Sequence, residues 1–188
     1  MLTKEDIISQ IKNFISDEKR IEFLEKILPK QTDKETRKFI LLTLANLYEK
    51  KQMFNSALTY YTQLSSLLVK FKEQQEIFLK IAKLYVKIFN FSAAEDYLKK
   101  AIAASNKSEE ERIRQEYIKF CLDEAADYER KKKILKAIKI YEYLASRDIN
   151  KIDMLKKIAY LYEKDSMPLE AAKIKRYIKE IEKKEKKE

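Results

Sequence analysis

One pattern of alanine and tyrosine occurs four times along the chain, in residues 44–64, 81–101, 124–144 and 158–178, which align without a gap. In each copy an alanine is followed three residues later by a tyrosine and twelve residues later by a second alanine. The residues in these positions are Ala45, Tyr48, Ala57, Ala82, Tyr85, Ala94, Ala125, Tyr128, Ala137, Ala159, Tyr162 and Ala171. The first alanines are separated by 37, 43 and 34 residues, and the extra residues fall between the copies. Such a period is typical of folds that stack small similar units.

The composition predicts that these units are helical. Glycine is absent and proline occurs twice in 188 residues, whereas β-rich folds need many tight turns that use glycine for positive φ. We therefore expect an all-α chain with very few positive-φ residues. Capping-box patterns at residues 32–35 and 108–111, with Thr32 and Ser108 as caps, predict two helix starts. Asn55, Asn90 and Asn150 are expected at helix boundaries, as caps or in left-handed geometry.

The repeated pattern resembles the tetratricopeptide repeat (TPR), a helix-turn-helix unit of about 34 residues. The resemblance covers roughly residues 38–182 and implies a right-handed superhelical α-solenoid of antiparallel helix pairs, with about ten helices. Four repeats are expected, at about residues 38–71, 75–108, 118–151 and 152–182. The chain departs from the family at the turn glycine, which is replaced in the four copies by Gln52, Phe89, Lys132 and Ser166.

The two ends of the chain lack the repeated pattern. Residues 1–37 contain two amphipathic segments and equal numbers of acidic and basic side chains, which favours an N-terminal helical hairpin that caps the array over an independent interaction domain. Pro29 is expected to end the second of these helices. Residues 183–188 are a charged tail that continues the last helix without its apolar stripe, and we expect it to fray.

The sequence argues against catalysis and against a bound metal or cofactor. Histidine is absent, and the missing glycine removes every glycine-rich phosphate-binding loop. Asp123 and Asp127 share one helix face beside Glu124, but a solvated face is the better explanation of these carboxylates. Cys121 lies where the pattern expects a packed side chain, which favours a small buried residue over a reactive thiol. We therefore predict no catalytic, cofactor-binding or metal-binding residues.

The net charge of +10 is compatible with nucleic acid, with an anionic membrane surface, or with a general excess of lysine. Only seven of the 41 cationic residues are arginine, the residue favoured for bidentate recognition of phosphate and base edges. The run from Arg130 to Lys133 is expected to be a solvated turn. Binding of RNA or of an anionic surface is therefore the second hypothesis, and a protein partner is the first.

The resemblance implies that the first helix of each pair lines a concave groove that receives an extended peptide or a partner helix. Carried over by position, the predicted groove residues are Phe39, Leu42, Asn46, Lys50, Leu79, Lys80, Lys83, Lys87, Lys119, Leu122, Arg130, Lys156 and Tyr160. They suggest a basic groove, suited to a partner with hydrophobic anchors and acidic flanks. Leu42, Leu79 and Leu122 recur at one position, where they either form apolar pockets or belong to the partly buried scaffold.

The compartment is inferred from the single cysteine and the first residues. Cys121 cannot form an intrachain disulfide, and the charged start offers neither a secretory signal nor a membrane span. We therefore expect a cytoplasmic scaffold or adaptor without a membrane span. Self-association through the end repeats is left open.

Overall fold

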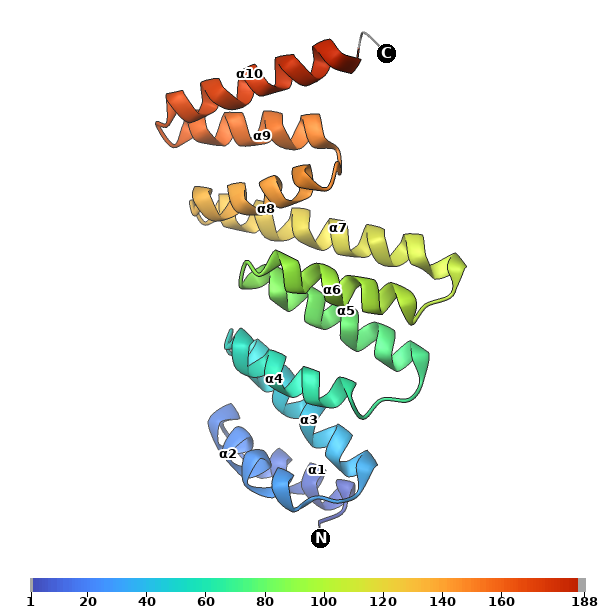
Figure 1. Ribbon diagram of the computed structural model, residues 1–188. Helices are drawn as coiled ribbons and strands as arrows, with labels where there is room; N and C mark the ends of the chain where they lie inside the picture. Colours follow the sequence, from blue (N-terminus) through green and yellow to red (C-terminus); the bar gives the residue numbers. More distant parts are fainter. Residues whose placement is uncertain (1, 186–188) are drawn as a thin grey trace. The chain divides into compact units, whose positions relative to one another are not determined.

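The computed structural model describes residues 2–185, and within them it contains helices and no strand (Figure 1). The elements in chain order are α1 (Lys4–Asn13), α2 (Asp17–Ile27), the 3-10 turn η1 (Leu28–Lys30), α3 (Lys34–Lys50), α4 (Phe54–Ser65), α5 (Phe71–Lys87), α6 (Phe91–Ala103), α7 (Lys107–Arg130), α8 (Ile134–Ser146), α9 (Lys151–Lys164) and α10 (Pro168–Glu185). The all-α class and the helix number agree with the prediction. Within the expected tail, α10 continues to Glu185, and residues 186–188 lie outside the described residues.

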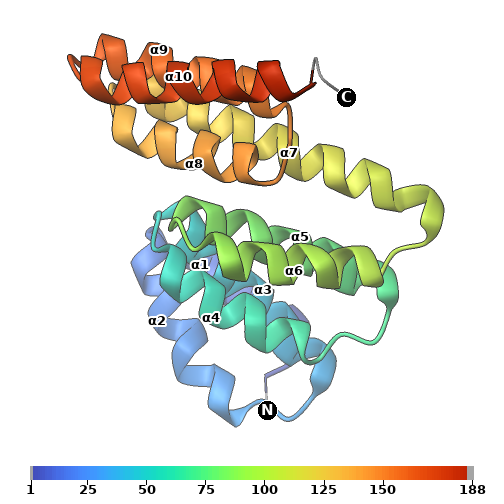
Figure 2. The ribbon, with the colours of Figure 1, turned by 45° about the horizontal axis from the view of Figure 1, so that its top comes forward.

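The chain folds as two compact units. The first consists of residues 2–84 and 93–110, and the second of residues 85–92 and 111–185. Each copy of the repeated pattern forms one antiparallel helix pair, namely α3 with α4, α5 with α6, α7 with α8, and α9 with α10 (Figures 1 and 2). The extra residues before the third copy are helical and lengthen α7, which begins at Lys107 rather than near the expected residue 118.

The eight signature alanines are all buried. A methyl group is the smallest side chain that still favours a helix, so alanine at these positions allows the helices of a pair to approach closely. Larger apolar side chains, among them Leu44, Ile81, Ile113, Ile140 and Leu161, fill the interior around them. The repeated pattern is therefore the buried seam of each pair.

The turn within each pair places one residue in the left-handed region, where glycine is usually found. Gln52, Phe89, Lys132 and Ser166 have φ of 60°, 59°, 56° and 58°. Each donates its backbone N–H to the carbonyl three residues before it, and the next residue donates to the carbonyl of the signature tyrosine, at 2.8–3.2 Å. This is the Schellman arrangement. The resemblance therefore placed the turns correctly.

The expectation of very few positive-φ residues is wrong, because Asp148 and Asn150 bring the total among the described residues to six. Asn55, Asn90 and Asn150 all lie at helix starts, as expected. Of the three, only Asn150 is left-handed, while Asn90 follows the left-handed Phe89 and Asn55 lies in the first turn of α4. The hydrogen bonds of the turn determine which position is left-handed. The type of side chain at that position does not.

Glycine at such a position is expected to be tolerated better than lysine. A residue with a Cβ pays about 1–2 kcal/mol to adopt the left-handed conformation. Glycine avoids this penalty but loses about 0.5–1 kcal/mol more conformational free energy on folding, because it is more flexible in the unfolded chain. We expect Lys132→Gly to raise the free energy of unfolding by up to about 1 kcal/mol. Lys133→Gly is the control, because the neighbouring lysine has φ −94° and the change should be destabilising. Urea unfolding measures both, and equal effects would contradict the left-handed assignment.

Two helix starts occur close to where the sequence placed them, with different caps. Asp33, not Thr32, caps α3 and accepts from the backbone N–H of Thr36 at 2.8 Å. At α7, Asn106 rather than Ser108 accepts from the backbone N–H of Glu109, at 3.1 Å. Asp and Asn are stronger caps than Thr. A complete capping box is found instead between Thr3 and Asp6 at α1.

Candidate functional site

A cluster of polar side chains joins the first two helix pairs inside the first unit. The hydroxyl of Tyr61 in α4 donates to Asn46 at 2.6 Å and to Glu49 at 2.9 Å, both in α3. The Nζ atom of Lys80 in α5 lies 3.2 Å from the carboxylate of Glu49. Burial, and next the charge of Glu49, raises the pKa of Tyr61, so its hydroxyl remains a proton donor. Lys80 and Asn46, both predicted groove residues, thus take part in internal contacts.

The same cluster recurs in the second unit. Tyr141 donates to Glu129 at 2.6 Å, and Lys157 in α9 lies 3.1 Å from the same carboxylate. Each glutamate directly follows a signature tyrosine, and each tyrosine stands sixteen residues after a signature alanine. These clusters link a helix pair to the first helix of the next pair.

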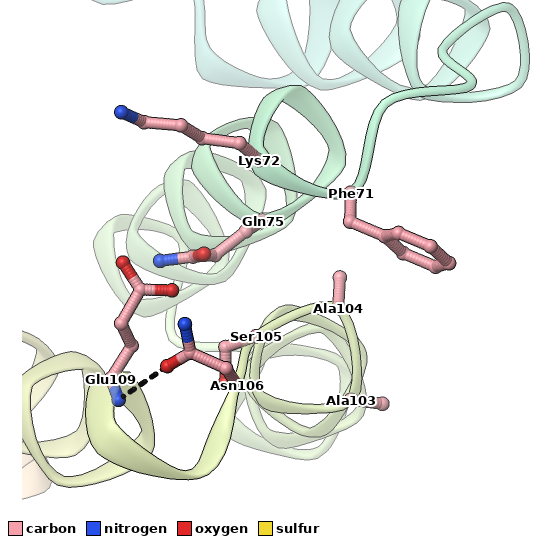
Figure 3. A pocket seen from close by; sticks show the side chains of 8 residues that line it. All are labelled: Phe71, Lys72, Gln75, Ala103, Ala104, Ser105, Asn106 and Glu109. Atoms are coloured by element: carbon pink, nitrogen blue, oxygen red, sulfur yellow. Dashed lines mark hydrogen bonds between the residues drawn. The ribbon is translucent and has the colours of Figure 1, made fainter.

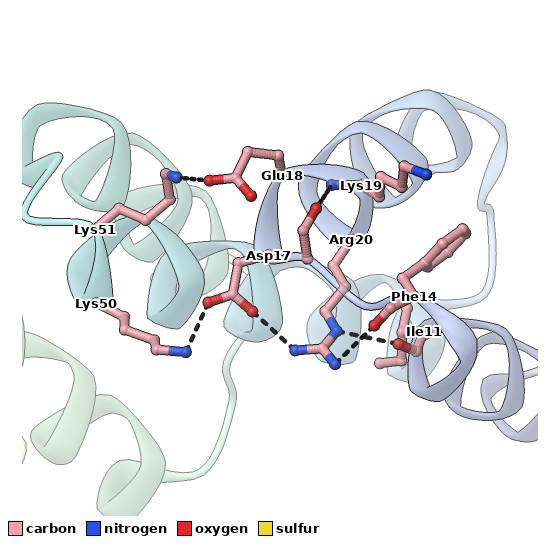
Figure 4. A network of polar contacts seen from close by, with 9 residues as sticks. Ile11, Phe14, Asp17, Glu18, Lys19, Arg20, Lys50 and Lys51 are labelled. Carbon is pink, nitrogen blue, oxygen red and sulfur yellow. Dashed lines mark hydrogen bonds and ion pairs between the residues drawn. The ribbon is translucent and has the colours of Figure 1, made fainter.

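The N-terminal helices reach other predicted groove residues on α3 (Figure 4). Asp17 accepts from Lys50 at 2.7 Å and from Arg20 at 2.8 Å, while Lys51 pairs with Glu18. The ammonium of Lys4 lies 5.4 Å from the ring centroid of Phe39. Phe39 and Lys50 are therefore engaged by α1 and α2.

Glu25 in α2 anchors the same helices to the first pair. Its carboxylate accepts hydrogen bonds of 2.6 Å from the hydroxyls of Tyr48 and Tyr60, whose rings are stacked with centroids 5.5 Å apart. Burial, and next the hydrogen bond to Glu25, raises the pKa of Tyr48 to about 12. The two hydroxyls therefore remain donors near neutral pH.

Several predicted cations of the second unit also pair within the chain. Lys87 lies 2.6 Å from Glu124 and 5.5 Å from the centroid of Phe120. Arg130 pairs with Asp127 at 3.2 Å, and Lys156 lies 3.7 Å from Glu182. Carboxylates one helical turn away or on the next helix offset these charges, so the expected basic character is weaker than the lysine count suggests.

The predicted row of leucines is not uniform. Leu42 is 38% exposed, Leu122 is half-buried and Leu79 is only 6% exposed. Leu79 belongs to the packed interior, so the apolar-pocket interpretation is wrong at that position. Lys83 is half-buried on the same helix.

A surface on α7 and α9 keeps most of its predicted side chains accessible. Tyr160 is 54% exposed, Lys119, Arg130 and Lys156 are exposed, and Leu122 is half-buried. The ion pair between Lys157 on α9 and Glu129 on α7 joins the two helices, and the Nζ atom of Lys157 lies 5.8 Å from the centroid of the Tyr160 ring. We call Lys119, Leu122, Arg130, Lys156 and Tyr160 the α7/α9 surface.

Cys121 and the acidic side chains are the remaining candidates for a chemical site. Cys121 is buried, as predicted. Over the described part of the chain, no three His, Cys, Asp or Glu side chains gather as metal ligands would. None of the helices between residues 2 and 185 has the length and hydropathy needed to cross a bilayer.

Comparison with known proteins finds likeness among solved structures. The chain is similar to "Crystal structure of MamA", at 22% identity and a TM-score of 0.42 over 100% of this chain and 99% of that one. It is also similar to "Crystal structure of BtubC (BKLC) from P. vanneervenii", at 14% and 0.46 over 97% and 80%. A third is the "Podosopora anserina putative kinesin light chain nearly identical TPR-like repeats", at 14% and 0.41 over 98% and 95%. No protein-family model and no curated protein matches the chain.

The alanine seams and the four left-handed turns at the expected positions decide the fold. The fold is of the TPR type. The identities and TM-scores of the similar structures are low. The assignment of the fold therefore depends on the repeat geometry of the chain itself.

The sequence-based prediction missed two groups of polar residues in this TPR-type fold. Glu49 and Glu129 were placed in no cluster, although a glutamate after the signature tyrosine in three of four copies was a visible signal. Gln75 and Asn106, which line a pocket at the ends of helices, belong to no repeated pattern. No sequence signal indicated that pocket.

Proposed function

We propose that this chain is a non-enzymatic scaffold that binds a peptide or helix of another protein on the α7/α9 surface. The observation that carries this proposal is the exposure of Tyr160. The residue is 54% exposed on α9, whose opposite face packs inside the helix pair. Large aromatic side chains of this kind, when a partner covers them, contribute most of the binding energy of many interfaces.

The other side chains of the α7/α9 surface suggest the chemistry of the partner. Leu122 offers apolar surface on α7, and the exposed Lys119 on the same helix adds positive charge. Such an arrangement suits a segment with one or two hydrophobic anchors flanked by acidic residues, because the charges guide association and the anchors supply affinity.

The test selects 12-residue peptides from a random displayed library against the immobilised chain and measures their affinity by fluorescence anisotropy. Tyr160→Ala is expected to weaken the selected peptides at least tenfold, because it removes the central anchor. Tyr177→Ala is the matched control, since Tyr177 is a tyrosine of similar exposure on α10. Equal effects of the two changes, or no effect of Tyr160→Ala, would reject the α7/α9 surface as the binding site.

Nucleic-acid binding is tested with a separate variant of the basic turn after α7. Arg130 and Lys131 both pair with Asp127, so the basic run at this turn is partly neutralised. We expect only weak RNA binding that falls steeply as salt is raised. Submicromolar RNA affinity that is lost when Lys131, Lys132 and Lys133 are changed to alanine would replace the scaffold proposal with an RNA-binding one.

A further inference from the structure

A pocket of about 510 Å³ lies at the helix ends of the first unit, apart from every predicted groove residue (Figure 3). The first turn of α5, the last turn of α6 and the first turn of α7 form its walls. The extra residues between the second and third copies supply the wall from α7. The pocket is therefore a feature of this chain that the repeated pattern does not require.

Gln75 gives the pocket a polar wall. The residue is only 5% exposed, and within residues 2–185 no hydrogen bond of its side-chain amide is found. Figure 3 shows its amide directed into the space between α5 and α7. The amide atoms are not among the fully enclosed polar atoms without a partner in residues 2–185, so they reach the open space of the pocket. Water solvates them there, and a ligand that supplies both a donor and an acceptor can take the place of that water.

Asn106 provides a second amide on the opposite wall. Its Oδ1 atom is occupied, because it accepts from the backbone N–H of Glu109 at 3.1 Å and from the hydroxyl of Ser108 at 2.7 Å. The Nδ2 group points toward Gln75 in Figure 3 and remains available as a donor. Two amides thus face one space, one from α5 and the other from the residue that caps α7.

One large apolar side chain lines the pocket. Phe71 is 72% exposed there. Ala103 and Ala104 leave room on the opposite wall. An apolar side chain of a ligand would bury part of this surface and gain free energy in proportion to the area covered.

The charges at the pocket exclude a strongly ionic ligand. Lys72 and Glu109 are its two charged lining residues and offset one another. A phosphate or a nucleic acid would meet a carboxylate without a surplus of cations. An uncharged ligand with paired donors and acceptors fits better, and the peptide bond has this character.

We infer that this pocket binds an extended peptide segment with an apolar side chain. The amides of Gln75 and Asn106 hydrogen-bond the peptide backbone, and Phe71 packs against the apolar side chain. The site lies in the first unit, while the α7/α9 surface lies in the second, so the two proposals do not depend on one another.

The test uses two blocked pentapeptides, acetyl-Ser-Ala-Leu-Ala-Ser-amide and the same peptide with serine at its centre. Titration of the full-length chain is followed through the side-chain amide signals of Gln75 and Asn106 in ¹⁵N NMR spectra. The leucine peptide is expected to shift both signals in a saturable manner, and the serine peptide is expected to bind at least fivefold more weakly. No shift at either amide would overturn the inference.

Three variants locate the site. Gln75→Leu and Phe71→Ser are each expected to weaken the leucine peptide at least fivefold, and Asn106→Asp to do the same while keeping the cap of α7. Ile15→Ser, at another highly exposed residue, is the control and should leave binding unchanged.

Two further results separate this inference from simpler explanations. Gln75→Leu should keep or raise the melting temperature, whereas a fall would show that the amide is a structural group. Tyr160→Ala should not change pentapeptide binding. If Tyr160→Ala removes it while Gln75→Leu does not, the peptide binds on the α7/α9 surface and the pocket inference is wrong.

Discussion

Replacement of Ala94 by leucine is expected to lower the free energy of unfolding by about 1–3 kcal/mol. Ala94 is fully buried in α6, and the extra side chain must push the helices of the pair apart or adopt a poor rotamer. Urea unfolding followed by circular dichroism at 222 nm measures the change.

Ala103→Leu is the matched control, because Ala103 lies in the same helix and is exposed. The two substitutions change the helix propensity equally, so their difference reports packing alone. An equal loss of stability in both variants would mean that the assigned seam of the second helix pair is wrong.

Replacement of Glu129 by valine is expected to lower the free energy of unfolding by about 2 kcal/mol. The change leaves the buried hydroxyl of Tyr141 without its acceptor and Lys157 without its carboxylate. When one partner of a buried hydrogen bond is removed, the other partner stays buried without a hydrogen bond. This costs more free energy than the hydrogen bond itself contributes to stability.

The double variant Glu129→Val with Tyr141→Leu provides the sharper measurement. It installs the residues that the second copy already carries at these positions, Val86 and Leu98. Because both polar partners are removed together, we expect the double variant to recover at least about 1 kcal/mol relative to Glu129→Val. Additive losses from the two single changes would show that the hydrogen bond contributes nothing to stability.

The sequence predicted those parts of the fold that depend on local pattern. The buried alanines and the left-handed turn residues each follow from spacing within one helix pair, so the repeated pattern was enough to assign Ala94 to the seam and Phe89 to the turn. The length of α7 could not be predicted in this way, because the repeated pattern does not extend into the residues between the copies, where α7 begins.

The candidate site was less predictable, because charge pairing depends on how helices stack. Lys50 pairs with Asp17 and Lys87 with Glu124, at separations of 33 and 37 residues. Helix spacing alone gives no reason to join these residues, so a count of lysines overestimated the positive charge. Tyr160 was correctly placed on the first helix of its pair, and its role in binding stays a proposal.

The turn at Phe89 has a consequence for how the second unit unfolds. Because this left-handed position holds phenylalanine instead of glycine, its ring packs on Tyr128 and Phe91, with centroids 5.6 Å and 6.2 Å apart. Lys136 and Lys139 lie within 6 Å of the same ring.

A glycine turn can open without disturbing its neighbours, whereas opening this turn must pull an aromatic ring away from the following helix pair. In a linear array of repeats, such contacts are the nearest-neighbour terms that make separate units melt together. The backbone N–H groups of Phe89 and Asn90 should therefore exchange with deuterium as slowly as those of α7, in one cooperative step.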